Sequence, residues 1–68
     1  MVTGMWVEVK RASNLMMAEM WKELFEGEGV PTRILPDPQS GKEGEFAPYI
    51  IYIPKFREHV IEEVLRKL

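Results

Sequence analysis

The chain has 68 residues, of which 46% are hydrophobic and 29% charged, with a net charge of −2 and no cysteine. The lack of cysteine excludes disulfides, thiol catalysis, iron–sulfur clusters and cysteine zinc sites, and the slight acidity disfavours nucleic-acid binding, which needs a basic surface. So short a chain buries only about 60% of its unfolded surface, so we expect one domain over residues 1–68, stabilised as a homodimer.

Two negative features bear on where the protein resides. No apolar run approaches the length of a membrane span. The opening residues lack the basic head and the continuous apolar stretch of a signal peptide. We therefore expect a cytoplasmic protein that makes no membrane contact.

The first expected element is a strand over residues 5–10, MWVEVK, where β-forming residues alternate along the chain. Successive side chains of a strand point to opposite faces. The strand therefore presents two sets of side chains: Met5, Val7 and Val9 on one face, and Trp6, Glu8 and Lys10 on the other.

A helix is expected next, over residues 15–26, with Ser13 or Asn14 as its cap and with Gly27 or Gly29 at its end. Its apolar arc spans roughly 200°, wider than the ~100° that a helix packed on one side needs. The arc contains Met16, Met17, Ala18, Met20, Trp21, Leu24 and Phe25.

Two strands and a second helix complete the chain. Residues 30–35 predict a short edge strand, since Pro31 cannot donate to a ladder. Residues 49–53, YIIYI, are apolar on both faces and predict a central strand. Pro54 ends that strand and begins a helix over residues 55–68. The apolar side of this helix has Val60, Ile61, Val64, Leu65 and Leu68, with Phe56 at its margin, and Glu62 is placed to pair with Arg66.

The element order is therefore β-α-β-β-α, which indicates an α+β protein. A right-handed crossover followed by a hairpin predicts a ferredoxin-like fold, with a three-stranded antiparallel sheet of order 1-3-2 and two helices on one face. The first strand is then left with an open outer edge. The face of the sheet opposite the helices, here called the bare face, is uncovered as well. This edge, the wide apolar arc of the first helix and the bare face are the surfaces that a second copy can cover.

A long polar segment, PDPQSGKEGEFAP at residues 36–48, joins the second and third strands. Hairpin connections usually take two to five residues, and loops of about a dozen are commonly functional or disordered. Phe46 is an aromatic in this polar setting, and we expect it to anchor a protein partner on residues 37–47. The alternative is a tolerated insertion without a role, because each doubling of loop length costs only about 0.6 kcal/mol.

Other candidate binding residues are less specific. Lys42 lies in SGKEG, an incomplete match to a phosphate loop that is more typical of a solvated turn. Arg57 falls inside the apolar arc of the last helix, where it either extends along apolar surface or forms an anion pocket with the free amides after Pro54. Trp6 and Tyr52 are expected on the bare sheet face, where we favour subunit or partner contact over RNA stacking.

Nothing in the chain indicates catalysis. The methionines of the first helix are typical of a core or an adaptable interface rather than of a copper site. His59 is expected on the solvent side of the last helix, and no motif positions a serine nucleophile beside it. We therefore expect a protein that is not an enzyme and has no cofactor and no metal site.

Three signatures occur together: ASNLMMAEMWKELFEGEGVPTRI, SGKEGEFAP and YIIYIPKFREHVIEEVLRKL. They resemble a small family of prokaryotic signal-transducing proteins that is classed with the GlnB-like (PII-type) ferredoxin folds. The resemblance implies a regulatory module that acts through protein or small-ligand contacts, with the long loop contacting partners. This chain lacks the modifiable loop tyrosine, the second glycine-rich nucleotide loop and the fourth strand of PII proteins, so ATP binding is assigned to none of its residues. The alternative is a nucleotide- or RNA-binding domain that uses the bare sheet face.

Overall fold

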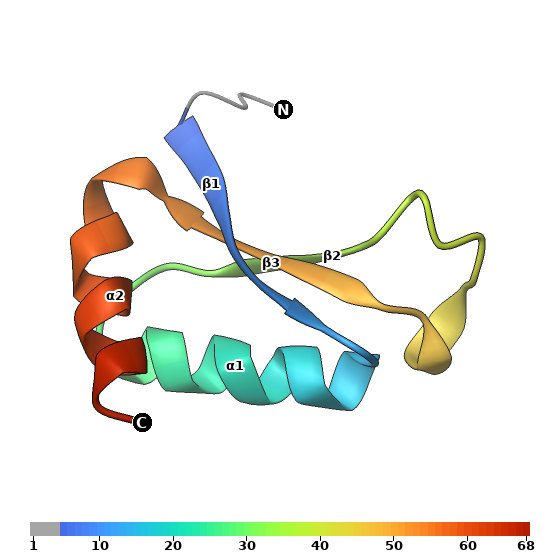
Figure 1. The fold of residues 1–68 in the computed structure, drawn as a ribbon, viewed down its shortest axis with the longest axis horizontal. Coiled ribbons are helices and arrows are strands. Elements are labelled where there is room, and N and C mark those ends of the chain that lie inside the picture. Colours follow the sequence, from blue (N-terminus) through green and yellow to red (C-terminus); the bar gives the residue numbers. More distant parts are fainter. Residues whose placement is uncertain (1–4) are drawn as a thin grey trace.

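A computed structural model describes residues 5–68 of the protein (Figure 1). Its elements are β1 (Trp6–Ala12), α1 (Leu15–Gly27), β2 (Arg33–Pro36), β3 (Tyr49–Pro54) and α2 (Glu58–Arg66), with short 3₁₀ helices η2 (Gly44–Phe46) and η3 (Lys55–Arg57). The predicted β-α-β-β-α order is confirmed.

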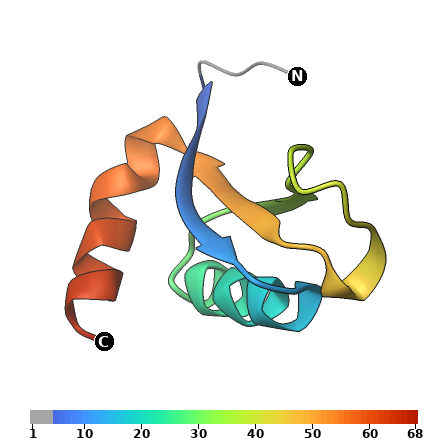
Figure 2. The same ribbon diagram turned by 45° about the vertical axis from the view of Figure 1, so that its right-hand side comes forward.

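The three strands form an antiparallel sheet of order β1-β3-β2, as predicted. Figures 1 and 2 show α1 running beneath the sheet and α2 standing at the end where β3 finishes. The central strand is apolar on both faces, with Ile50 buried on one face and Ile51 and Ile53 buried on the other. The prediction that YIIYI forms the middle strand is therefore confirmed.

One core joins the sheet to both helices. On β3, Ile51 and Ile53 are fully buried against Ala18 and Phe25 of α1, and α2 adds Ile61. Both helices therefore pack against the same core, and the opposite face of the sheet is left without a helix. That second face and the loop before β3 are the places where function can reside.

The ends of α1 follow from local hydrogen bonding. The side-chain oxygen of Asn14 accepts a hydrogen bond from the Met17 amide at 2.8 Å, which satisfies one of the free donors of the first turn. Gly27 is the last helical residue, and Gly29 has a φ of 85°, in the left-handed region that favours glycine. Asn14 is thus the cap, and the predicted left-handed glycine is Gly29.

A β-bulge in β1 overturns part of the predicted alternation. Glu8 pairs with Tyr52 and Lys10 pairs with Ile51, so Val9 is an extra residue in the ladder. Because paired residues share a face, Lys10 turns toward the helices, and its ammonium lies 4.7 Å from the centre of the Trp21 ring. The prediction that Lys10 lies on the bare face is wrong, and Arg11 takes that place.

The second strand begins later than predicted, at Arg33 rather than at Val30. Val30 is fully buried, and its amide donates to the carbonyl of Phe25 at 3.0 Å. It therefore belongs to the turn that closes α1.

The last helix is also shorter than predicted. After Pro54 the chain first makes the 3₁₀ helix η3, and the regular helix starts at Glu58. Leu68 is 71% exposed, so it lies outside the core that Ile61 enters. Arg66 pairs with Glu63 at 2.8 Å and not with Glu62.

Candidate functional site

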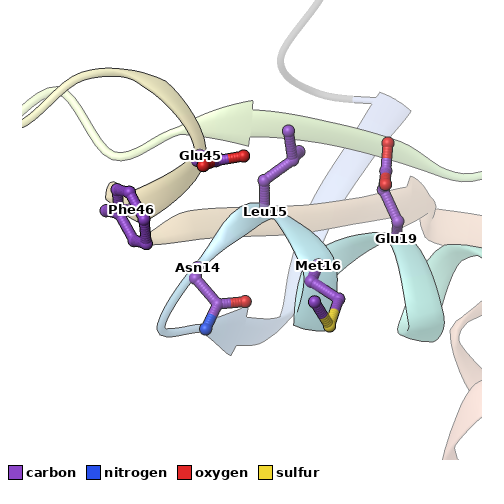
Figure 3. Close-up of a pocket in the computed structure, with 6 residues that line it drawn as sticks. All are labelled: Asn14, Leu15, Met16, Glu19, Glu45 and Phe46. Atoms are coloured by element: carbon purple, nitrogen blue, oxygen red, sulfur yellow. The ribbon is translucent and has the colours of Figure 1, made fainter.

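The loop between β2 and β3 ends at η2, which holds Phe46 beside the start of α1. The Phe46 side chain is 77% exposed, and the neighbouring Met16 is 71% exposed. Both side chains line a hollow of about 350 Å³. Figure 3 shows Glu45 of η2 pointing toward Leu15 at the start of α1, with Phe46 beside it. The hollow is lined by Asn14, Leu15, Met16, Glu19, Glu45 and Phe46. The lining thus combines apolar side chains with the carboxylates of Glu19 and Glu45.

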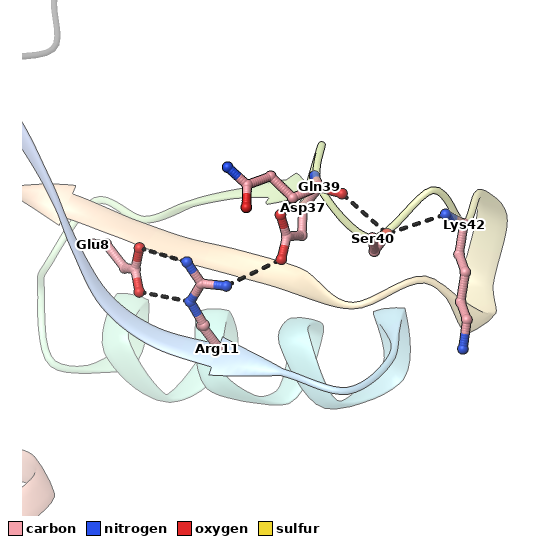
Figure 4. Close-up of polar contacts among 6 residues, drawn as sticks. All are labelled: Glu8, Arg11, Asp37, Gln39, Ser40 and Lys42. Atoms are coloured by element: carbon pink, nitrogen blue, oxygen red, sulfur yellow. Dashed lines mark hydrogen bonds and ion pairs between the residues drawn. The ribbon is translucent and has the colours of Figure 1, made fainter.

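Hydrogen bonds among its own polar groups hold the first half of this loop in place (Figure 4). Asp37 accepts a hydrogen bond from the Gln39 amide at 2.9 Å, and its own amide donates to the Pro48 carbonyl at 2.9 Å. The Ser40 hydroxyl donates to the Asp37 carbonyl at 3.1 Å and accepts from the Lys42 amide at 3.1 Å. These short-range bonds are typical of turns that Asp and Ser stabilise.

The second half of the loop is fixed from β3. The Tyr49 hydroxyl donates to the Gly44 carbonyl at 3.1 Å, and the Ala47 amide donates to the same carbonyl at 3.2 Å. Ala47 is fully buried, and Gly44 has a φ of 79°, which lets the chain turn into η2. Phe46 is therefore exposed, while Gly44 before it and Ala47 after it are joined by hydrogen bonds.

Arg11 connects the loop to β1. Its guanidinium lies 2.9 Å from a Glu8 carboxylate oxygen and 3.0 Å from an Asp37 carboxylate oxygen (Figure 4). The hydrogen bond to Glu8, together with the charges of both carboxylates, raises the pKa of Arg11 above its ordinary value. Arg11 thus stays charged, and it links the outer strand to the first residue of the loop across the bare face.

Trp6 and Tyr52 lie on the bare face of the sheet, as predicted, and both side chains are half-buried. Arg33 is directly opposite Tyr52 in the ladder, and its guanidinium lies 4.5 Å from the centre of the Trp6 ring. Such a cation–π contact is worth about 0.5–1 kcal/mol at an exposed site. A flat ligand that stacked on this face of Trp6 would have to displace Arg33.

The remaining predicted residues lie apart from one another. Lys42 is exposed and lines a second hollow of about 520 Å³ over the loop, beside Asp37 and Glu43. Arg57 lies on η3, between β3 and α2, where it donates to the Gly29 carbonyl at 3.2 Å. That bond joins η3 to the turn after α1, so it favours a packing role for Arg57, and its role in anion binding stays a prediction.

Residues 5–68 contain neither a candidate metal cluster nor a helix that could span a membrane. No group of three or more His, Asp or Glu side chains in this part of the chain could hold a metal ion. None of the helices in the same part combines the length and the apolar character needed to cross a membrane.

Comparisons of the chain with family models, with curated proteins and with solved structures find no match. The resemblance to prokaryotic signal-transducing proteins therefore stays a prediction. Function has to be argued from the geometry of the loop end and of the sheet face.

Proposed function

We propose that the protein is a small regulatory binding module without enzymatic activity, and that it holds a protein partner at the η2 end of the sheet. The observation that carries the proposal is the 77% exposure of Phe46 on a loop whose flanking residues are hydrogen-bonded. Exposed apolar groups that gather on a surface mark interaction sites. Here Phe46 is accompanied by Met16 and by the hollow between them.

The restraint of the loop is what favours binding over a tolerated insertion. Ordering a flexible segment opposes association, so a loop that is already held binds with less entropic cost. Buried aromatic anchors near the centre of an interface commonly contribute most of the binding energy. Phe46 has the exposure and the fixed neighbours that such an anchor needs.

The resemblance in sequence supports a signalling role for this binding. In the PII-type proteins that the chain resembles, the loop between the second and third strands contacts partners. The loop from Asp37 to Ala47 joins β2 to β3, which is the same topological place. We propose that the protein acts in the prokaryotic cytoplasm as a module that transmits a signal by engaging its partner through this loop.

The alternative function, nucleotide or RNA binding on the bare face, has weaker support. Arg33 occupies one face of the Trp6 ring, and two carboxylates neutralise Arg11. We expect no binding of single-stranded RNA at physiological salt, measured by fluorescence anisotropy. Binding that falls steeply with salt and is lost in Trp6→Ala and in Tyr52→Ala would favour the alternative, because released counterions make phosphate contacts salt-sensitive.

Affinity capture from lysate of the source cells tests the proposed function. Phe46→Ala should lose the captured partner, with a fall of at least tenfold in affinity once the partner is purified, because alanine replacement of a central anchor typically costs about 2 kcal/mol or more. Phe56→Ala is the matched control, since Phe56 is a second phenylalanine with a large exposed fraction, 67%, and lies on η3. Equal capture by both variants would count against the loop site.

A further inference from the structure

The hollow beside Phe46 carries charge of a single sign. Its apolar lining is formed by Leu15, Met16 and Phe46. Glu19 of α1 and Glu45 of η2 also line it, and both glutamates are exposed. Among residues 5–68, no lysine or arginine contributes to the lining. An apolar surface and two negative charges therefore share one small site.

Neither of these carboxylates is neutralised by the fold. Within the part of the chain that the structure describes, the ion pairs use Arg11 and Arg66 as their cations, and neither of these pairs includes Glu19 or Glu45. Lys22 follows Glu19 by three residues on α1 and makes no ion pair in the same part of the chain. Both carboxylates are thus available to a positive charge on a binding partner.

We propose that the partner inserts a basic segment into this hollow, with one apolar side chain flanked by lysine or arginine residues. The inference rests on the proposed function, since it takes the hollow beside Phe46 as the surface that the partner covers. Covering the hollow removes water from Glu19 and Glu45, and a desolvated charge without a counter-charge is strongly unfavourable. Cationic groups on either side of the apolar one avoid that loss.

A negatively charged partner does not fit this end of α1. The first turn of a helix commonly attracts anions, through its free amides and its dipole. Here the Asn14 side chain already accepts a hydrogen bond from the Met17 amide, and Glu19 and Glu45 line the same hollow. Like charges across an interface suppress binding, so the hollow should select its partner by the sign of the charge.

Two synthetic peptides test the sign of the charge before the natural partner is known. The probe is Lys-Lys-Leu-Lys-Lys with blocked termini, and its control is Glu-Glu-Leu-Glu-Glu. At millimolar concentration, the lysine peptide should shift the amide NMR signals of residues 14–19 and 44–46, and the glutamate peptide should leave them unmoved. Equal shifts with both peptides, no shifts with the lysine peptide, or shifts confined to other residues would overturn the proposal.

Paired substitutions separate the hollow from the net charge of the protein. Glu19→Gln combined with Glu45→Gln should lower the affinity for the lysine peptide about fivefold, because each exposed ion pair contributes little. Glu26→Gln combined with Glu62→Gln removes the same charge from exposed residues outside the hollow. At physiological salt this control should lower the affinity less than about twofold, since distant charges are screened. Equal losses would show attraction by net charge alone and overturn the proposal.

The natural partner then distinguishes this inference from the proposed function. The variant with Glu19→Gln and Glu45→Gln keeps Phe46, so weaker binding of the Phe46-dependent partner to it would support the basic segment. Undiminished binding would overturn the basic segment and leave the loop site standing. Undiminished capture by Phe46→Ala would instead remove the proposed function, and the inference with it.

Discussion

Replacing Phe25 with alanine should remove a large part of the free energy of unfolding at 25 °C. Phe25 is fully buried, and its ring centre lies 5.8 Å from that of Trp21. Removing a buried phenylalanine ring costs about 3–5 kcal/mol, because both the burial and the packing around the cavity are lost. A domain of this length has a total free energy of unfolding of only about 3–10 kcal/mol.

Urea unfolding followed by circular dichroism measures this effect. Phe56→Ala is the control, since Phe56 is 67% exposed and its removal should change the free energy of unfolding by less than about 0.5 kcal/mol. A Phe25→Ala variant within about 1 kcal/mol of the wild type would show that α1 does not pack on the sheet as described, since that loss is well below the cost of a buried ring.

Ile61→Ala should produce the second-largest loss of stability. Ile61 is the buried residue of α2, with an exposed fraction of 1%, so it is the main attachment of this helix to the core. Truncating a buried isoleucine to alanine costs about 2–5 kcal/mol.

The matched control for this prediction is Leu68→Ala, which removes an aliphatic side chain that is 71% exposed. It should change the free energy of unfolding by less than about 0.5 kcal/mol in the monomer, measured at low micromolar concentration. Similar losses for both variants would mean that α2 is held by its C-terminal end rather than by Ile61.

Most of the fold could be predicted because local and long-range signals agree. The all-apolar strand YIIYI could only be central, and Asn14 and Gly29 are residue types that helix ends favour. The bulge at Val9 could not be predicted, since an apolar residue between Glu8 and Lys10 continues a perfect alternation. Only pairing with β3 shows that the alternation shifts there.

The candidate site was predictable in part. Phe46 could be singled out as the aromatic of a polar loop, but nothing in its neighbourhood along the chain connects it with Met16, which is brought beside it by the fold. The roles of Arg11 and Arg33 were missed for a related reason. Both depend on strand register, which turns their side chains across the bare face toward Asp37 and Trp6.

The restraint of the loop was also only partly foreseeable. Its prolines, glycines and charges predict a solvated segment. The order of Asp37 and Ser40 allows the turn bonds that the structure contains, but the bond from Tyr49 to Gly44 depends on where β3 begins. Asp37 pairs with Arg11 and Ala47 is buried, so both belong to the fold and should be kept when the loop is tested.

Replacing residues 38–46 with a two-residue Asn-Gly turn tests most directly whether this loop is the binding surface. Asp37 donates to Pro48 across the hairpin, so Asn-Gly followed by the retained Ala47 makes a three-residue connection, a length that is common in hairpins and keeps the register of β2 and β3. We predict a nearly unchanged melting temperature and complete loss of the partner in affinity capture. A folded, loop-shortened protein that still captures the same partner would contradict the account.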